Sequence, residues 1–530
     1  MKTATERLGR FGLMFISIIS VSCGLTAAAG QSPDLDEILN RHLKALGGRD
    51  AISRIGATAA YSTIDYQGVR GKMIIMAVPP SKYFASYTLG AAGFRMGYDG
   101  VVGWMTDANG ISRRQYAEEL KPMIDDVYFQ NYAYAIPGLL PGKTVRRDDT
   151  LIAGRRYFCM ALFPAGGDSL LIYINDVTGL IDYRVENVGG LRAVTTYTDY
   201  RPVAGVMTPF SIDLTTPGAP YRISSRLDSM KVNIRIPDSL FAPPAAAVED
   251  FRFPPGADSA VIPFQLDDGH LYVTTGVNGR GPFRFLLDSG AGASLLAKRV
   301  ADELGIVTFG DLPIRGVGGY GAIGLAEIDS LTLGGLCLYL KHVAVLTPIS
   351  SGSEAFRKLD GILGYDFFAR FAVSIDFEKR RIVISRSGKY SPLTEGRSIG
   401  LEVYAQIPVV EAEVDGQPIR MAVDLGAQAG LVIRGSAKAL AAPGEDNSQT
   451  DRVFQIGGVG GLGSVRKLNI KRLTLAGFDI DNPPALAAEK FADFPMPEYI
   501  EGLLGVQILK DFNLIIDYQA GNLVLSRREH

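Results

Sequence analysis

The chain has 530 residues, of which 47% are hydrophobic and 21% charged. These values are close to the average for folded proteins and exclude wholesale disorder, and the length suggests three or four domains. The formal net charge is −2, so no basic excess exists to neutralise a phosphate backbone and we expect no nucleic-acid partner. The four histidines are scattered without metal-ligand spacing, so we expect neither a metal nor another cofactor.

The N-terminal segment has the pattern of a secretory signal. Basic residues precede an apolar run at 11–21, and small residues follow it up to Ala29. The run is shorter than the 20 or so residues of a membrane span. We therefore predict a signal peptide at 1–29 and export to the periplasm or the medium. Cys23 leaves an alternative open, in which lipidation of this cysteine anchors the protein to a membrane.

Residues 30–243 combine a helical start with a long series of strand patterns. An apolar stripe at helical spacing opens the region, and strands with turn punctuation follow from about residue 58 to residue 240. This pattern predicts an antiparallel sheet with helical additions. The next segment, 244–260, is rich in proline and alanine and predicts a linker.

The same region resembles the lipoprotein-carrier fold over roughly residues 34–243. The resemblance rests on LNRHLKALGG, YDGVVGW, YINDVTGLIDYRVEN and VNIRIPDSLFAPP. It implies a half-barrel α+β domain whose curved antiparallel sheet surrounds an apolar cavity, with a lipid or lipoprotein as ligand. A purely structural scaffold is the alternative.

The second half of the chain is an internal repeat. Three blocks recur in the same order in both copies. The pairs are 277–291 with 414–427, 316–321 with 458–463, and 361–386 with 502–527. The last pair aligns without a gap and has nine identities in 26 positions. The repeat predicts two β-rich lobes, at 261–390 and 391–530.

Each copy carries one Asp-x-Gly-Ala turn at the end of an apolar strand. Asp288 precedes Gly290, and Asp424 precedes Gly426, and glycine allows the sharp turn. Pseudo-twofold symmetry would bring the two carboxylates face to face. Carboxylates about 3 Å apart cannot both ionise, so they share one proton. Such a pair acts as base and acid in one site, and we expect Asp288 to accept the proton of a water and Asp424 to act as the acid.

The stretch LLDSGAGASLLAKRVADELGI followed by GILG resembles the retropepsin-like aspartic proteases. The match covers about 262–386, and 399–527 repeats it more weakly. The resemblance implies a mainly β fold, with two retropepsin-like β-barrel lobes in pseudo-twofold arrangement after the half-barrel domain. It also implies a polypeptide substrate, and because both lobes lie in one chain we expect a monomer.

The family's site falls on equivalent positions of the two turns. The resemblance implies that Asp288 and Asp424 are the catalytic dyad, that Ser289 braces the dyad through its hydroxyl, and that Gly290 and Gly426 complete the turns.

One position departs from the family pattern. Leu425 stands where the family has Thr or Ser, so it cannot donate the second hydrogen bond of the brace. Three interpretations stay open: an exported aspartic endopeptidase with an asymmetric brace, a catalytically degenerate peptide- or lipid-binding or sensor protein, and a lipid carrier with accessory lobes.

Two glycine runs spell G-x-G-x-x-G, but strand-like residues follow them. A dinucleotide site requires a helix there, so we predict flexible hairpins that fold over substrate, like the family's flap. Tyr320 at the first tip either touches substrate or is a surface aromatic. The predicted flap residues are Gly316, Gly318, Gly319, Tyr320 and Gly321, and Gly458, Gly460, Gly461 and Gly463.

Overall fold

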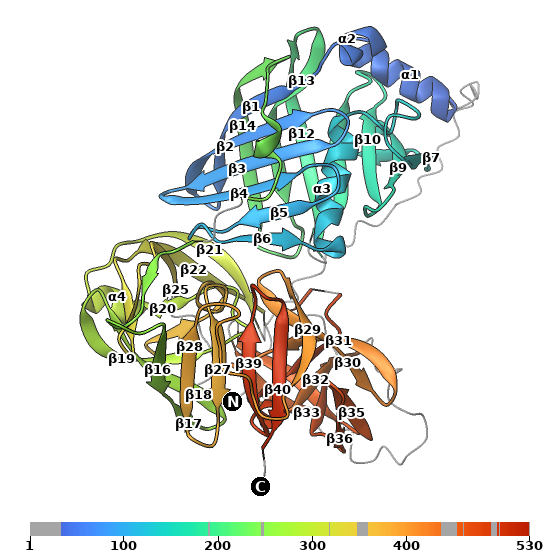
Figure 1. The fold of residues 1–530 in the computed structure, drawn as a ribbon. Helices are drawn as coiled ribbons and strands as arrows, with labels where there is room; N and C mark the ends of the chain where they lie inside the picture. Colours follow the sequence, from blue (N-terminus) through green and yellow to red (C-terminus); the bar gives the residue numbers. More distant parts are fainter. Residues whose placement is uncertain are drawn as a thin grey trace, which may run out of the picture.

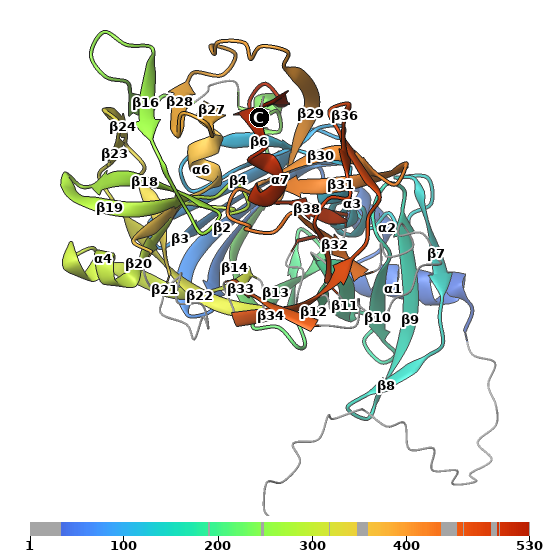
Figure 2. The same ribbon diagram turned by 90° about the horizontal axis from the view of Figure 1, so that it is seen from below.

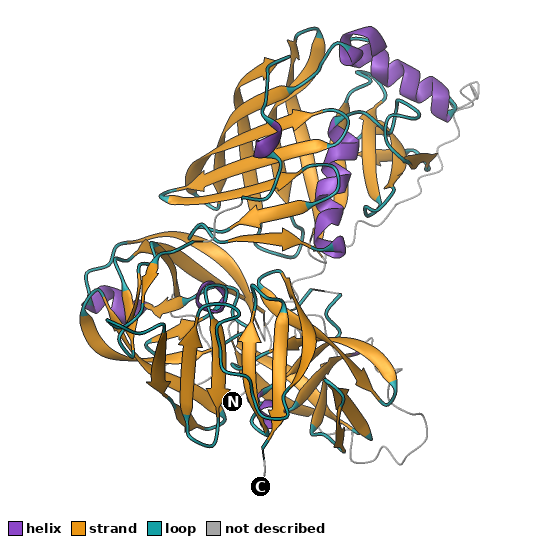
Figure 3. Cartoon of the chain, viewed as in Figure 1, coloured by secondary structure: helices purple, strands orange, loops and turns teal. Residues whose placement is uncertain are grey.

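The protein is mainly β, as predicted, and Figure 3 shows a few short helices among several large sheets. The computed structural model describes residues 33–188, 191–244, 248–316, 319–346, 359–435, 453–458, 461–488, 496–497 and 499–528. The predicted signal peptide with Cys23, and Gly318 and Gly460 of the predicted flaps, lie outside these residues. In Figure 1 a curved N-terminal sheet stands above two smaller β bodies.

The N-terminal sheet has 14 strands, all in antiparallel pairs. Its order is β6-β5-β4-β3-β2-β1-β14-β13-β12-β11-β10-β9-β7, with β8 on β9. Strand β1 pairs with β14 inside the sheet and so joins the strands β1–β6 to the strands β7–β14, while β6 and β7 are the edges of the sheet. The strands are β1 (Thr58–Tyr66), β2 (Val69–Val78), β3 (Lys82–Leu89), β4 (Ala92–Tyr98), β5 (Gly103–Thr106), β6 (Ser112–Gln115), β7 (Gly142–Arg146), β8 (Thr150–Ile152), β9 (Arg155–Pro164), β10 (Leu170–Asn175), β11 (Ile181–Val188), β12 (Leu191–Val203), β13 (Val206–Thr215) and β14 (Arg222–Val232).

Helices cover part of this sheet. They are α1 (Leu35–Leu46), α2 (Arg49–Ser53), α3 (Ala117–Gln130) and the 3₁₀ turn η1 (Asp238–Leu240). Asp34 caps α1 by accepting from the Glu37 amide, and the apolar stripe of α1 is buried. Helix α3 lies across one face of the sheet (Figure 1), where Met123 and Val127 pack against Tyr83. Helix α3 therefore covers this part of the sheet face.

The first C-terminal sheet has 11 strands in the order β15-β24-β23-β18-β19-β26-β20-β25-β22-β21, with β17 on β18. We call 261–390 the first unit and 391–528 the second unit. The strands are β15 (Phe251–Arg252), β17 (Gln265–Asp267), β18 (His270–Val277), β19 (Arg280–Leu287), β20 (Leu295–Ala297), β21 (Thr308–Gly316), β22 (Gly319–Glu327), β23 (Leu331–Leu333), β24 (Leu336–Leu338), β25 (His342–Leu346) and β26 (Gly361–Leu363).

The second C-terminal sheet has 15 strands in the order β16-β28-β27-β39-β40-β29-β30-β31-β38-β32-β37-β34-β33, with β35 on β30 and β36 on β35. The strands are β16 (Ser259–Pro263), β27 (Ala372–Asp376), β28 (Arg381–Ser385), β29 (Arg397–Tyr404), β30 (Ile407–Val414), β31 (Gln417–Val423), β32 (Leu431–Arg434), β33 (Val453–Gly458), β34 (Gly461–Leu468), β35 (Arg472–Leu475), β36 (Phe478–Asp481), β37 (Ala485–Ala488), β38 (Gly502–Leu504), β39 (Phe512–Asp517) and β40 (Asn522–Arg527).

The two units repeat one strand order. The run β18-β19-β26-β20-β25-β22-β21 has its counterpart in β30-β31-β38-β32-β37-β34-β33. In both runs the second and third strands are parallel. Short helices follow equivalent glycines in each unit, namely α6 (Tyr365–Phe368) and α7 (Val506–Leu509), and α4 (Lys298–Glu303) is in the first. Within the described residues each strand order is an open path rather than a closed barrel.

A shared sheet joins the two units. Strand β27 of the first pairs antiparallel with β39 of the second, from Ala372 opposite Asp517 to Ile375 opposite Leu514. Figure 1 shows β28, β27, β39 and β40 side by side, and Figure 2 shows β27 and β28 near the C-terminus. One hydrophobic cluster runs through both units and includes Phe285 and Leu425. Because the backbone ladder and the core are continuous, the relative position of the two units is fixed.

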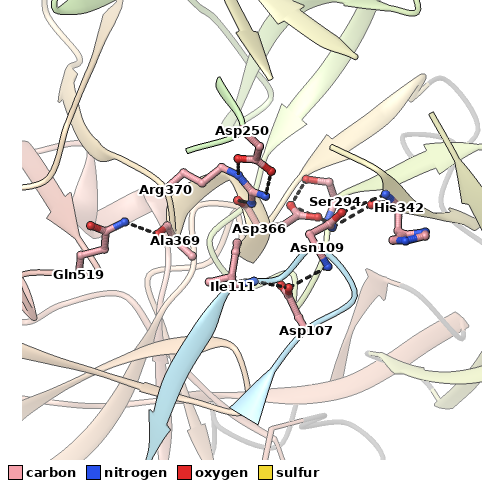
Figure 4. Close-up of polar contacts among 10 residues, drawn as sticks. All are labelled: Asp107, Asn109, Ile111, Asp250, Ser294, His342, Asp366, Ala369, Arg370 and Gln519. Atoms are coloured by element: carbon pink, nitrogen blue, oxygen red, sulfur yellow. Dashed lines mark hydrogen bonds and ion pairs between the residues drawn. The ribbon is translucent and has the colours of Figure 1, made fainter. Parts of the chain in front are cut away.

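The segment predicted as a linker is packed against the first unit. Strand β15 pairs with β24, and β16 pairs with β28. Asp250 forms an ion pair with the buried guanidinium of Arg370 (Figure 4), and Phe251 lies 4.7 Å from Phe371, ring centroid to centroid. The segment therefore connects the N-terminal sheet to the units and adds strands to their sheets.

The N-terminal sheet also contacts both units through the β5–β6 region. Asn109 accepts from the His342 amide and donates to the His342 carbonyl, each at 2.9 Å (Figure 4). Arg113, which is paired with Glu119, donates to the Val403 carbonyl at 3.2 Å. Glu119 also accepts a hydrogen bond from the Ala405 amide of the second unit at 2.8 Å. No helix among the described residues is long and apolar enough to span a membrane.

Candidate active site

Each Asp turn follows the end of a strand that is paired in parallel with another strand of the same unit. The Asp288 amide donates to the Leu363 carbonyl at 3.0 Å, and the Asp424 amide donates to the Leu504 carbonyl at 2.8 Å. These bonds extend the β19–β26 and β31–β38 ladders by one residue. Each Asp is thus held by the glycine-bounded strand of its own unit, at equivalent places.

The structure brings the two turns together. Within each turn the carboxylate accepts from the amide of the glycine two residues later, Gly290 or Gly426, at 2.8 Å. A Cβ atom on Gly290 would collide with the carboxyl group of Asp424, and one on Gly426 would collide with that of Asp288. Each glycine therefore faces the opposite carboxylate, and only glycine leaves room for this approach.

Burial and mutual contact set the protonation of the pair. Burial raises the pKa of Asp288 well above its usual 3.8, and the charge of Asp424 and a hydrogen bond with it act in the same direction. Burial also raises the pKa of Asp424, but the hydrogen bond from Asp288 and the turn amides oppose this. The two carboxyl groups therefore share one proton, and the pair titrates as a unit.

The brace beneath the dyad is one-sided. The Ser289 hydroxyl, 0% exposed, donates to the Val423 carbonyl at 2.7 Å and accepts from the Leu425 amide at 3.0 Å. Leu425 is also 0% exposed and packs in the shared core. The second turn thus replaces a hydroxyl with an apolar contact.

Two polar residues near the turns were not predicted. The Tyr518 hydroxyl of the second unit donates to the Ser289 carbonyl at 3.4 Å. In the repeat, Tyr518 is equivalent to Phe377. The hydroxyl is present in one copy only, and this difference could have indicated Tyr518 from the sequence. Asp366 accepts from the Ser294 amide at 3.1 Å and from its hydroxyl (Figure 4). Ser294 in turn accepts from the Gly364 amide.

The two glycine runs form hairpins. In the first, β21 pairs with β22, and Gly316 lies opposite Gly319. In the second, β33 pairs with β34, and Gly458 lies opposite Gly461. Strands β22 and β34 contact each other. A strand rather than a helix follows each run, so the context of a dinucleotide site is missing.

The described residues contain no group of three or more His, Cys, Asp or Glu side chains that could bind a metal ion. The acid–base pair is the chemistry that this arrangement presents.

Comparison with known proteins bears on this region. A sequence model of the aspartyl protease family matches the chain twice, at 273–367 and 410–508. No curated protein matches significantly. Among solved structures, the aspartic proteinase from Irpex lacteus is 13% identical with a TM-score of 0.36, and the match covers 51% of this chain and 98% of that one. A putative outer membrane lipoprotein-sorting protein domain from Vibrio parahaemolyticus is 10% identical with a TM-score of 0.28, over 39% and 95% of the two chains.

Proposed function

We propose that the protein is an exported, monomeric aspartic endopeptidase whose tandem lobes are the two units and whose catalytic dyad is Asp288 and Asp424. The observation that carries the proposal is the reciprocal packing of Gly290 and Gly426 on the opposite carboxylates. The double match to the aspartyl protease family supports it.

The protonation of the pair supports a mechanism with balanced proton transfers. The ionised carboxylate of the pair accepts a proton from a water, whose oxygen attacks the peptide carbonyl carbon, while the protonated partner donates its proton to the carbonyl oxygen. In the tetrahedral intermediate, the carboxyl group that took the water's proton gives it to the leaving nitrogen, and its partner recovers a proton from the gem-diol. The C–N bond breaks, and the dyad returns to its starting state with one shared proton.

The test is cleavage of casein by the purified mature protein between pH 3 and 8, with and without an aspartic-protease inhibitor. We expect inhibitor-sensitive cleavage in acid. Asp288→Asn and Asp424→Asn should each reduce turnover by several orders of magnitude, and the double variant should lose little more, because the two residues act as a unit. Asp329→Asn, on an exposed loop, is the matched control. Full activity in Asp288→Asn would end the proposal.

The burial of Leu425 favours a second candidate, a peptide- or lipid-binding protein on the same fold that has lost turnover. An apolar residue in place of the second hydroxyl is compatible with a turn that serves only packing. This candidate predicts that casein stays intact under all conditions. A lipid or lipoprotein ligand of the N-terminal sheet belongs with it.

Export rests on the pattern of residues 1–29. We expect the first residue of the mature protein to be near Gly30, which sequencing of the N-terminus of the purified protein measures. An acylated Cys23 at that position would instead anchor the protein to a membrane.

A further inference from the structure

The first hairpin, β21–β22, shares a hydrophobic cluster with the N-terminal sheet. The buried members from the sheet include Val69 and Leu89, and those from the hairpin are Leu312 and Leu325. Figure 1 shows this hairpin along the boundary between the sheet and the units. Segments more than 200 residues apart in the chain thus form one core at this boundary.

The contact at the base of the hairpin is close. A Cβ atom on Gly90 would collide with the ring of Phe309, and one on Gly310 would lie 2.7 Å from a methyl carbon of Val69. Both glycines also have positive φ, +57° and +82°, which other residues rarely adopt. Both backbones therefore have a glycine at the point of closest approach, where a larger side chain would not fit.

A second contact holds the hairpin near its tip. Tyr221, at the end of the turn before β14, lies edge-on to Tyr320, with ring centroids 5.7 Å apart and an interplanar angle of 80°. This is the edge-to-face geometry that aromatic pairs prefer. Tyr320 lies opposite Arg315 in the hairpin register, and burial lowers the pKa of Arg315. The tip of the hairpin is thus packed against the N-terminal sheet.

The repeat supplies an internal comparison, because 142 residues separate equivalent positions of the two hairpins. Leu312 is 8% exposed, but its counterpart Phe454 is 40% exposed. The counterpart of Tyr320 is Leu462, which is 52% exposed. The residue equivalent to the buried Leu325 is a lysine. Leu312 and Leu325 are therefore buried in the first hairpin, whereas their counterparts in the second are an exposed phenylalanine and an exposed lysine.

We propose that the N-terminal sheet is a fixed mount for the first hairpin, in which Tyr221 is a positioning residue that holds the ring of Tyr320 in place. The inference rests on the proposed function for its link to substrate. It gives the N-terminal sheet a role in the protease reaction that is independent of any ligand of its own.

Hydrogen–deuterium exchange of the full chain tests the mount without requiring activity. We expect slower exchange at 319–327 than at 461–468. Tyr221→Ala should raise exchange at 319–327 about three- to tenfold, as the loss of one aromatic pair allows, and leave 461–468 unchanged. Tyr221→Phe keeps the ring contact and is the matched control. Equal exchange in the two hairpins, or no response to Tyr221→Ala, would overturn the proposal.

Kinetics on casein peptides add a readout specific to positioning. Tyr221→Ala should raise KM several-fold with kcat nearly unchanged, because the dyad is intact, and Tyr221→Phe should restore the wild-type KM. A loss of kcat with unchanged KM would contradict the positioning role. Since exchange is measured on the folded chain, an inactive protein with an immobile first hairpin would refute the protease and leave the mount standing.

Discussion

The hydroxyl of Ser289 is the strongest test of how the dyad is held, because it alone makes both brace hydrogen bonds. Ser289→Ala removes the donor to the Val423 carbonyl and the acceptor for the Leu425 amide. Both groups lie in a region without exposed surface, so neither gains water as a replacement. Each lost bond costs about 1–2 kcal/mol when its partner stays buried and unpaired. We therefore expect the free energy of unfolding to fall by about 2–4 kcal/mol.

Urea unfolding followed by far-ultraviolet circular dichroism measures this loss. The single tryptophan, Trp104, lies in the N-terminal sheet, so its fluorescence would not report on the units. Ser398→Ala removes an exposed hydroxyl in the second unit and should change stability by less than about 0.5 kcal/mol. A loss that small in Ser289→Ala would refute the brace as the structure presents it.

Three further predictions follow from the dyad. The folded pKa values of Asp288 and Asp424 are raised, so the stability that the shared proton contributes is complete below the unfolded pKa of about 3.8 and is lost as pH rises through the folded values. Asp288→Asn should therefore gain stability over the wild type between pH 4 and 7, measured by urea midpoints. Leu425→Thr exchanges buried apolar area, worth about 1–3 kcal/mol, for a hydrogen bond of about 0.5–1.5 kcal/mol. It should lower thermal stability slightly while it maintains or raises casein cleavage, whereas destabilisation with no cleavage favours the degenerate protein. Activity should rise in proportion to enzyme concentration at nanomolar levels, and a quadratic rise would exclude a monomeric dyad.

Local patterns predicted much of the architecture because they are carried by neighbouring residues. The alternation of apolar residues predicted the antiparallel N-terminal sheet, and the repeat predicted equivalent places for Asp288 and Asp424. In the structure, Gly290 and Gly426 each lie against the carboxyl group of the opposite turn.

Long-range contacts were beyond the reach of the sequence. The bonds between Asn109 and His342 join residues 233 positions apart, and no periodicity records such a pair. The segment at 244–260 has the composition of a linker, yet Asp250 reaches Arg370, because one charged side chain in a proline-rich stretch does not reveal its partner. The sequence shows the asymmetry of the two hairpins only as Leu325 in one copy and Lys467 in the other. It does not show that the N-terminal sheet packs against Leu325.

The pairing of β27 with β39 has a consequence for the timing of assembly. Synthesis runs from the N-terminus, so the first unit and Asp288 leave the ribosome long before β39 is made. Until that strand takes its place, the first unit has an unpaired edge at β27, and neither Asp424 nor Tyr518 has a fixed position relative to it. The acid–base pair is therefore completed only when nearly all of the chain has emerged. A nascent chain therefore holds one isolated carboxylate, and the paired site does not exist while the chain is being made.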